Sequence, residues 1–98
     1  MGKETTHRVH VGDSEDLSAV DDDGVELVVT SPPYPMIEMW DDVFAGLDPE
    51  IGAALDAGEG REAFELMHEA LGRTWEEVAR VLVDGGIACV NVGDATRT

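Results

Sequence analysis

The sequence is poor in cysteine, in positive charge, in aromatic residues and in long apolar runs. Cys89 is the one cysteine in 98 residues, which excludes an internal disulfide and a zinc framework of several cysteines. No stretch approaches the roughly 18 apolar residues of a membrane span, and the first ten residues lack the apolar core of a secretory signal. We therefore expect a reducing, cytoplasmic setting, no membrane and no metal.

Positive charge is nearly missing, because 22 Asp and Glu residues stand against 6 Lys and Arg, a net charge of −16. The acidic residues are spread along the whole chain, which is typical of halophilic proteins. In molar salt the Debye length falls to about 3 Å, so self-repulsion of this size becomes tolerable. Taken alone, the charge argues against a nucleic-acid partner, since phosphates are bound by cations. We predict a halophilic surface, with an acidic mimic of nucleic acid as the alternative.

Hydrophobic patterning predicts a single α/β domain over residues 1–98, with about three parallel strands and helices. Residues 7–34 are expected to form a βαβ unit, with strands at 7–11 and 25–30 and a short helix between them. Because three strands do not complete a doubly wound sheet, we expect a truncated product or one half of a split protein.

The rest of the chain is predicted as helices and then one more strand. Residues 36–83 form a helical stretch whose longest helix covers 61–83, and 84–94 supply a Gly-Gly turn and the third strand. Cys89 and the aromatic residues of the helical stripes are expected in the core; these aromatics are Trp40, Phe64 and Trp75. Asp94 is expected in a turn, with an approach to the site as the alternative.

The segment Thr30-Ser31-Pro32-Pro33-Tyr34 follows the strand at 25–30, at the edge where open α/β sheets bind ligands. The two prolines leave the loop few conformations. The Ser31 hydroxyl and the free carbonyls can accept N–H bonds from a planar ligand that carries an amino group, while Tyr34 stacks on its face. A proline-rich turn without function is the alternative.

This TSPPY segment resembles motif IV of the DNA amino-methyltransferases, which methylate N4 of cytosine or N6 of adenine. The likeness extends upstream to Gly12-Asp13-Ser14, as in permuted enzymes of this group, and downstream to the glycine turn and strand of residues 81–94. Serine at position 31 is commonest among the cytosine-N4 enzymes. The resemblance implies a partial Rossmann-like, S-adenosylmethionine-dependent methyltransferase fold.

The resemblance also implies S-adenosylmethionine as cofactor, DNA as partner and a role for each loop residue. The candidate catalytic residues are Ser31, Pro32, Pro33 and Tyr34. Ser31 and the Pro32 carbonyl would accept hydrogen bonds from the exocyclic amine, Pro33 would hold the loop, and Tyr34 would stack on the flipped base. Asp13 matches a position that contacts the adenosine part of the cofactor, with a helix cap as its alternative.

One feature of the family, the glycine-rich cofactor loop, has no counterpart in these 98 residues. The resemblance therefore implies the N-terminal part of a site-specific cytosine-N4 methyltransferase of a restriction-modification system. A separately encoded C-terminal half is a candidate partner. The alternatives are an inactive remnant, an acidic interaction domain, and methylation of an amino group on RNA or protein.

Overall fold

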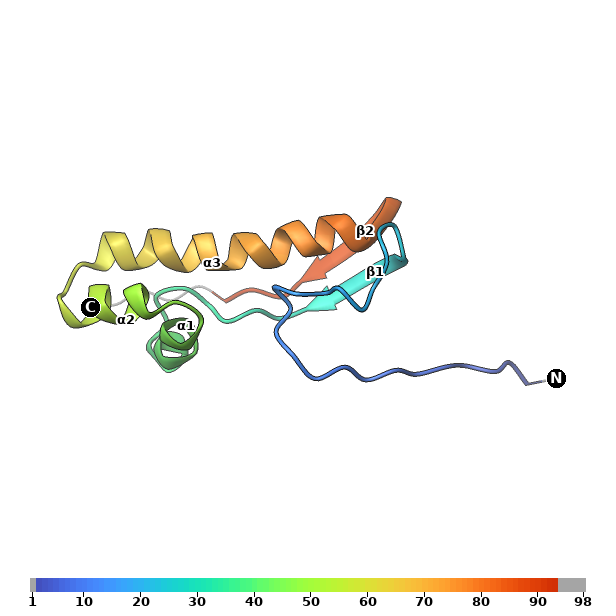
Figure 1. Cartoon of the computed structure of the whole chain (residues 1–98), viewed down its shortest axis with the longest axis horizontal. Helices are drawn as coiled ribbons and strands as arrows, with labels where there is room; N and C mark the ends of the chain where they lie inside the picture. The colour runs from blue at the N-terminus through green and yellow to red at the C-terminus, as the bar shows by residue number, and fades with distance from the viewer. Residues whose placement is uncertain (1, 94–98) are drawn as a thin grey trace.

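A computed structural model describes residues 2–93 and contains a two-stranded parallel sheet joined by a long helical crossover (Figure 1). Strand β1 (Val25–Thr30) pairs with strand β2 (Leu82–Val90), and Thr30 lies opposite Val90. The crossover consists of η1 (Glu38–Trp40), α1 (Asp41–Leu47), α2 (Pro49–Asp56) and α3 (Gly60–Val81). The α/β prediction is therefore confirmed, with two parallel strands in the described residues where three were predicted.

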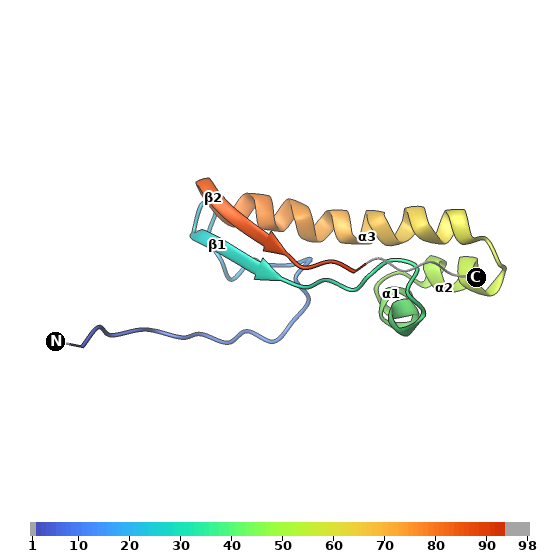
Figure 2. The same cartoon turned by 180° about the vertical axis from the view of Figure 1, so that it is seen from behind.

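The helices lie beyond the carboxyl ends of the strands, with α3 returning along the sheet (Figures 1 and 2). Helix α2 starts as its sequence predicts, since Asp48 caps it by accepting the Glu50 N–H at 3.0 Å and Pro49 occupies the first turn. Helix α3 ends at Val81 rather than at residue 83, because Leu82 already has extended backbone and begins β2.

The prediction of a strand at residues 7–11 is wrong for this structure. The segment runs extended and exposed along the N-terminal arm (Figure 1), with Val9 88% and Val11 101% exposed. A strand needs a neighbour that bonds its backbone groups, and β1 is paired only with β2. The βαβ unit of this chain is therefore β1, the helices and β2, rather than residues 7–34.

The short helix predicted after Asp13 is also absent, and two tight turns take its place. Asp16 N–H donates to the Asp13 carbonyl at 3.0 Å, and Val20 N–H donates to the Leu17 carbonyl at 2.8 Å. The Asp13 carboxylate accepts the Glu15 N–H at 2.9 Å. Aspartate side chains that bond nearby backbone N–H groups favour turns over helix, which explains the difference.

The core lies between the helices, where Phe44 of α1 and Ile51 of α2 meet Met67 and Leu71 of α3. Two residues predicted in the core lie elsewhere: Phe64 is 47% exposed, and Cys89 is exposed on β2. Trp40 and Trp75 are partly buried against the core. No helix within residues 2–93 is long and apolar enough to cross a bilayer. Asp94 lies outside the described residues.

Candidate functional site

The TSPPY loop leaves the carboxyl end of β1 as predicted and runs toward the helices. Asn91 N–H donates to the Thr30 carbonyl at 2.9 Å, which extends the pairing of the strands to the start of the loop. Pro32 is buried, while Ser31 is exposed and Tyr34 is half-buried. The loop therefore has a fixed proline base and presents one hydroxyl to solvent.

Two contacts between side chains set the position of Tyr34. Its phenol oxygen lies 3.1 Å from Ser31 Oγ, a hydrogen bond in which either hydroxyl can donate. Its ring meets the Trp40 ring edge-on, with centroids 6.1 Å apart at 68°. The two ends of the tyrosine are thus tied to different residues, so the ring is held in one place.

Gly93, just after β2, lies against the same ring. A β-carbon placed on Gly93 would stand 2.8 Å from Tyr34 Cε2 and 2.9 Å from Cδ2. That is closer than real β-carbons approach other atoms, so a side chain at this position requires the ring to move. The glycine is therefore part of the Tyr34 site, a role that the sequence did not reveal.

A cleft of about 270 Å³, here called the Asp13 cleft, lies on one side of the loop. It brings Asp13 and Ser14 together with Ser31, Pro32 and Pro33, and Thr74 of α3 also lines it. The candidate cofactor residue and the candidate catalytic loop thus share one cavity, although they are 18 residues apart in sequence. Tyr34 is not among the residues that line it.

A second cleft, of about 360 Å³, here called the Tyr34 cleft, is lined by the same two prolines. Tyr34 and Gly93 face Phe64, His68 and Trp75 of α3 across it. The Phe64 and His68 rings are in contact, with centroids 4.4 Å apart. Spacings of four and seven residues place these three side chains on one side of α3. Phe64 and Trp75 were predicted in the core, whereas here they line a cavity.

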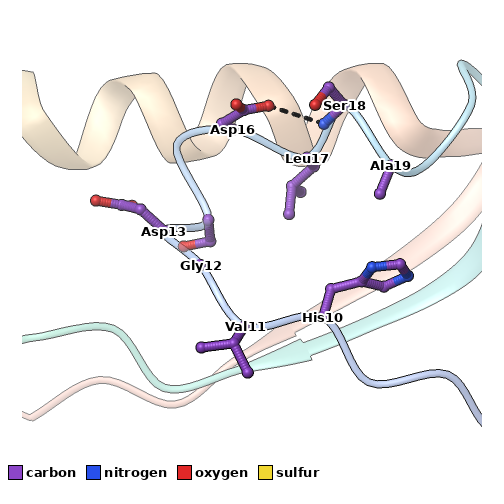
Figure 3. Close-up of a pocket in the computed structure, with 9 residues that line it drawn as sticks. His10, Val11, Gly12, Asp13, Asp16, Leu17, Ser18 and Ala19 are labelled. Carbon is purple, nitrogen blue, oxygen red and sulfur yellow. Dashed lines mark hydrogen bonds between the residues drawn. The ribbon is translucent and has the colours of Figure 1, made fainter.

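A third hollow, of about 430 Å³, is formed by residues 10–19 themselves (Figure 3). The figure shows the Asp13 carboxylate directed away from His10 and Leu17, and the Ser18 N–H bonded to the Asp16 carboxylate at 3.0 Å. The hydroxyl and the N–H of Ser18 lower the pKa of Asp16. Residues 2–93 hold no group of three or more His, Cys, Asp or Glu side chains suited to a metal ion.

Charged side chains of α3 contact the turns that carry Asp13. Arg80 Nε donates to Glu77 Oε1 at 2.9 Å, and Leu17 N–H donates to Glu77 Oε2 at 2.6 Å. The Arg80 guanidinium, followed by the Leu17 N–H, lowers the pKa of Glu77 to about 2. The carboxylate of Glu77, followed by that of Asp22, raises the pKa of Arg80. Both side chains are therefore charged at neutral pH.

Comparison with known proteins gives the same family for most of the chain. A family profile described as DNA methylase, N6_N4_Mtase, matches residues 25–98. The Type II methyltransferase M.MthZI of Methanothermobacter thermautotrophicus is 48% identical over 94 residues, which is 95% of this chain and 26% of the relative. The Type II methyltransferase M.MjaI of Methanocaldococcus jannaschii is 48% identical over 104 residues, 95% of this chain and 34% of the relative.

The chain thus spans between a quarter and about a third of the length of these curated relatives. No solved structure matches it significantly.

Proposed function

We propose that this chain, which belongs to the N6_N4_Mtase family of DNA methylases, carries the part of a DNA methyltransferase that binds the target base, and that the enzyme acts on N4 of cytosine. The proposal depends on one observation above all. Ser31, Pro32 and Pro33 line a cleft that Asp13 also lines. An acceptor for an amine and a candidate contact for the methyl donor therefore face one cavity.

The chemistry follows from what these groups can accept. Ser31 Oγ and the Pro32 carbonyl would each accept an N–H bond from the exocyclic amine, which draws the nitrogen lone pair out of conjugation with the base. In-line attack of this nitrogen on the methyl group of a bound donor would form the N–CH3 bond as the S–CH3 bond breaks, leaving a neutral thioether, and the amine proton would pass to water. Positioning and polarisation do most of this work, and no covalent bond to the protein forms.

Tyr34 supplies the stacking surface for a base that has left the duplex. The hydrogen bond between the Tyr34 phenol oxygen and Ser31 Oγ, 3.1 Å long, joins the stacking ring to the side chain that would accept the amine. Gly93 and Trp40 keep the ring in place. We therefore assign base stacking to Tyr34 and the shape of the loop to Pro33.

S-adenosylmethionine, when bound, supplies a methyl group that a nitrogen lone pair can attack. The described residues fit part of this molecule, because the Asp13 carboxylate can accept hydrogen bonds from hydroxyl groups inside the Asp13 cleft. A glycine-rich loop of the family type is absent from the 98 residues. We propose that the remainder of the donor site comes from polypeptide outside this sequence.

The surface of the sheet supports that proposal. Leu27 and Val29 of β1 are 56% and 74% exposed, and Ile87, opposite Leu27, is 61% exposed. Such an apolar patch is typical of a buried interface. We propose that the part of the enzyme corresponding to the rest of the relatives covers it, either in the same chain or as a separately encoded C-terminal half.

DNA contacts by this chain are expected to be few. Three arginines of α3, Arg61, Arg73 and Arg80, are already paired with carboxylates, at 3.6, 3.2 and 2.7 Å respectively. Phosphate binding needs free cations, so we assign it to the remainder of the enzyme. The names of the relatives, Type II methyltransferases, favour a restriction-modification context.

The experiment is methyl transfer from labelled S-adenosylmethionine to DNA at molar salt. The chain is assayed alone and with the part of the Methanocaldococcus relative that lies outside the matched residues. Label is expected in DNA with the mixture and is expected to vanish with Ser31→Ala or Tyr34→Ala. Absence of label in both reactions would refute the proposal and favour the alternative, an acidic interaction domain without catalysis.

A further inference from the structure

Residues 12–22, here called the Asp13 segment, contain no helix or strand. Their own turns fix only their local shape. Contacts with another element must therefore fix where the Asp13 carboxylate lies relative to Ser31. Helix α3 supplies these contacts through three charged side chains, Arg73, Glu77 and Arg80.

Arg80 makes the largest set of contacts with the segment. Its Nη2 donates to the Leu17 carbonyl at 2.9 Å and its Nη1 to the Val20 carbonyl at 3.0 Å. Nη1 also donates to Asp22 Oδ1 at 2.7 Å. A guanidinium has five N–H donors in a rigid fork, so one side chain can bind two carbonyls and a carboxylate together.

Glu77 completes the arrangement from the same face of α3. It accepts from Arg80 Nε at 2.9 Å and Nη2 at 3.0 Å, and it accepts the Leu17 N–H at 2.6 Å. The backbone of Leu17 is thus bound at both its N–H and its carbonyl. Glu77 is itself held by two bonds to the fork of Arg80.

The contacts at Leu17 are transmitted to Asp13 through the turns. Asp16, next to Leu17, donates its N–H to the Asp13 carbonyl at 3.0 Å, and Asp13 Oδ1 accepts the Glu15 N–H at 2.9 Å. Arg73 Nη2 binds Glu15 Oε1 at 3.2 Å from the same helix. The orientation of the Asp13 carboxylate is therefore defined by bonds that end on α3.

We propose that Glu77 and Arg80 are positioning residues for the methyl donor, which hold the Asp13 carboxylate at the Asp13 cleft beside Ser31. Both lie on α3, and two further residues of this helix, Leu71 and Thr74, line the same cleft. Glu77 and Arg80 thereby hold Asp13, the candidate contact for the donor, close to the part of α3 that lines the Asp13 cleft. This inference rests on the proposed function, because it assigns a donor to the cleft.

The test uses the full chain at molar salt with two readouts. Spin labels on Ala19→Cys and Ala79→Cys, both exposed positions, in a Cys89→Ser background give the distance between the segment and α3. Equilibrium dialysis with labelled S-adenosylmethionine, performed on the chain mixed with the part of the Methanocaldococcus relative that lies outside the matched residues, gives donor affinity. The variants are Arg80→Gln and Glu77→Gln, with Arg80→Lys as the charge-conserving variant. Arg61→Gln is the matched control, because Arg61 lies on α3 in an exposed ion pair with Glu65.

Arg80→Gln and Glu77→Gln are expected to broaden the distance distribution and to weaken donor binding about tenfold or more, because a misplacement of about 1 Å is costly in such sites. Arg80→Lys, which keeps the charge without the fork, is expected to recover part of both. In the completed enzyme the KM for the donor rises while kcat changes little, since Ser31 and Tyr34 are untouched. Arg61→Gln changes neither readout.

Broadening without weaker binding, or no broadening, would overturn the positioning role. If the parent chain, completed by the rest of the enzyme, shows a narrow distribution but binds no donor, the assignment of the donor to this cleft fails and the inference falls with it. In that case the distance readout still shows whether α3 holds the segment, so the two failures are distinguished. Thermal unfolding of each variant at the same salt separates local release of the segment from global loss of structure.

Discussion

Replacing Gly93 by alanine places a methyl group against the Tyr34 ring. The β-carbon would stand 2.8 Å from Cε2, whereas ordinary contacts begin at 3.4 Å, so the ring must move by roughly 0.6 Å. The ring is held by Ser31 Oγ at 3.1 Å and by the edge of Trp40, so it cannot move without straining these contacts. Overpacking of this kind costs about 1 kcal/mol or more.

The chain offers a matched control in Gly72, a glycine inside α3 with nothing within 4 Å of its added β-carbon. Gly72→Ala is expected to stabilise the protein by about 0.5–1 kcal/mol, because alanine favours helix. Urea unfolding at constant molar salt should therefore separate the two variants by about 1.5–2 kcal/mol. Equal stability, or a more stable Gly93→Ala, would refute the contact between Gly93 and Tyr34 and with it the fixed position of the ring.

Three further outcomes follow from the core, the Glu77 pair and the net charge. Phe44→Ala, at a fully buried position, is expected to cost about 3–5 kcal/mol in urea unfolding, while Val43→Ala, 44% exposed, costs much less. The pKa of Glu77 is lowered from 4.5 to about 2, so its contribution to stability is present above pH 4.5 and is lost as the pH falls toward 2. The free energy of unfolding of Glu77→Gln should therefore depend less on pH in that window. The melting temperature should rise steadily between about 0.1 and 1 M salt, because −16 charges repel in a small domain, and a salt-independent melt would contradict this.

The features that the sequence predicted correctly depend on short stretches of chain. The β-branched run of residues 25–30 and the prolines after it determine a strand and a loop at its carboxyl end whatever surrounds them. The cap at Asp48 with Pro49 is equally local. The roles of Asp13 and of the loop residues came from the family resemblance and stay predictions, while the structure places Asp13 and Ser31 in one cleft.

The features that the sequence missed depend on partners far away in the chain. Residues 7–11 have strand composition, but they pair with neither described strand, although each strand of the two-stranded sheet has an unpaired edge. Cys89 follows a core-like pattern, yet its face of the sheet is uncovered in residues 2–93. The contact of Gly93 with Tyr34 and the bonds of Arg80 to Leu17 join residues about 60 positions apart, so no local pattern encodes them.

We propose above all that Ser31 and the proline loop bind the amino group of a cytosine that has left the duplex. The most direct measurement is the nucleoside composition of DNA after reaction with the completed enzyme at molar salt, with Ser31→Ala alongside. We predict N4-methylcytosine from the parent protein and none from Ser31→Ala. Methyl groups found only on N6 of adenine, or N4-methylcytosine formed equally well by Ser31→Ala, would contradict it.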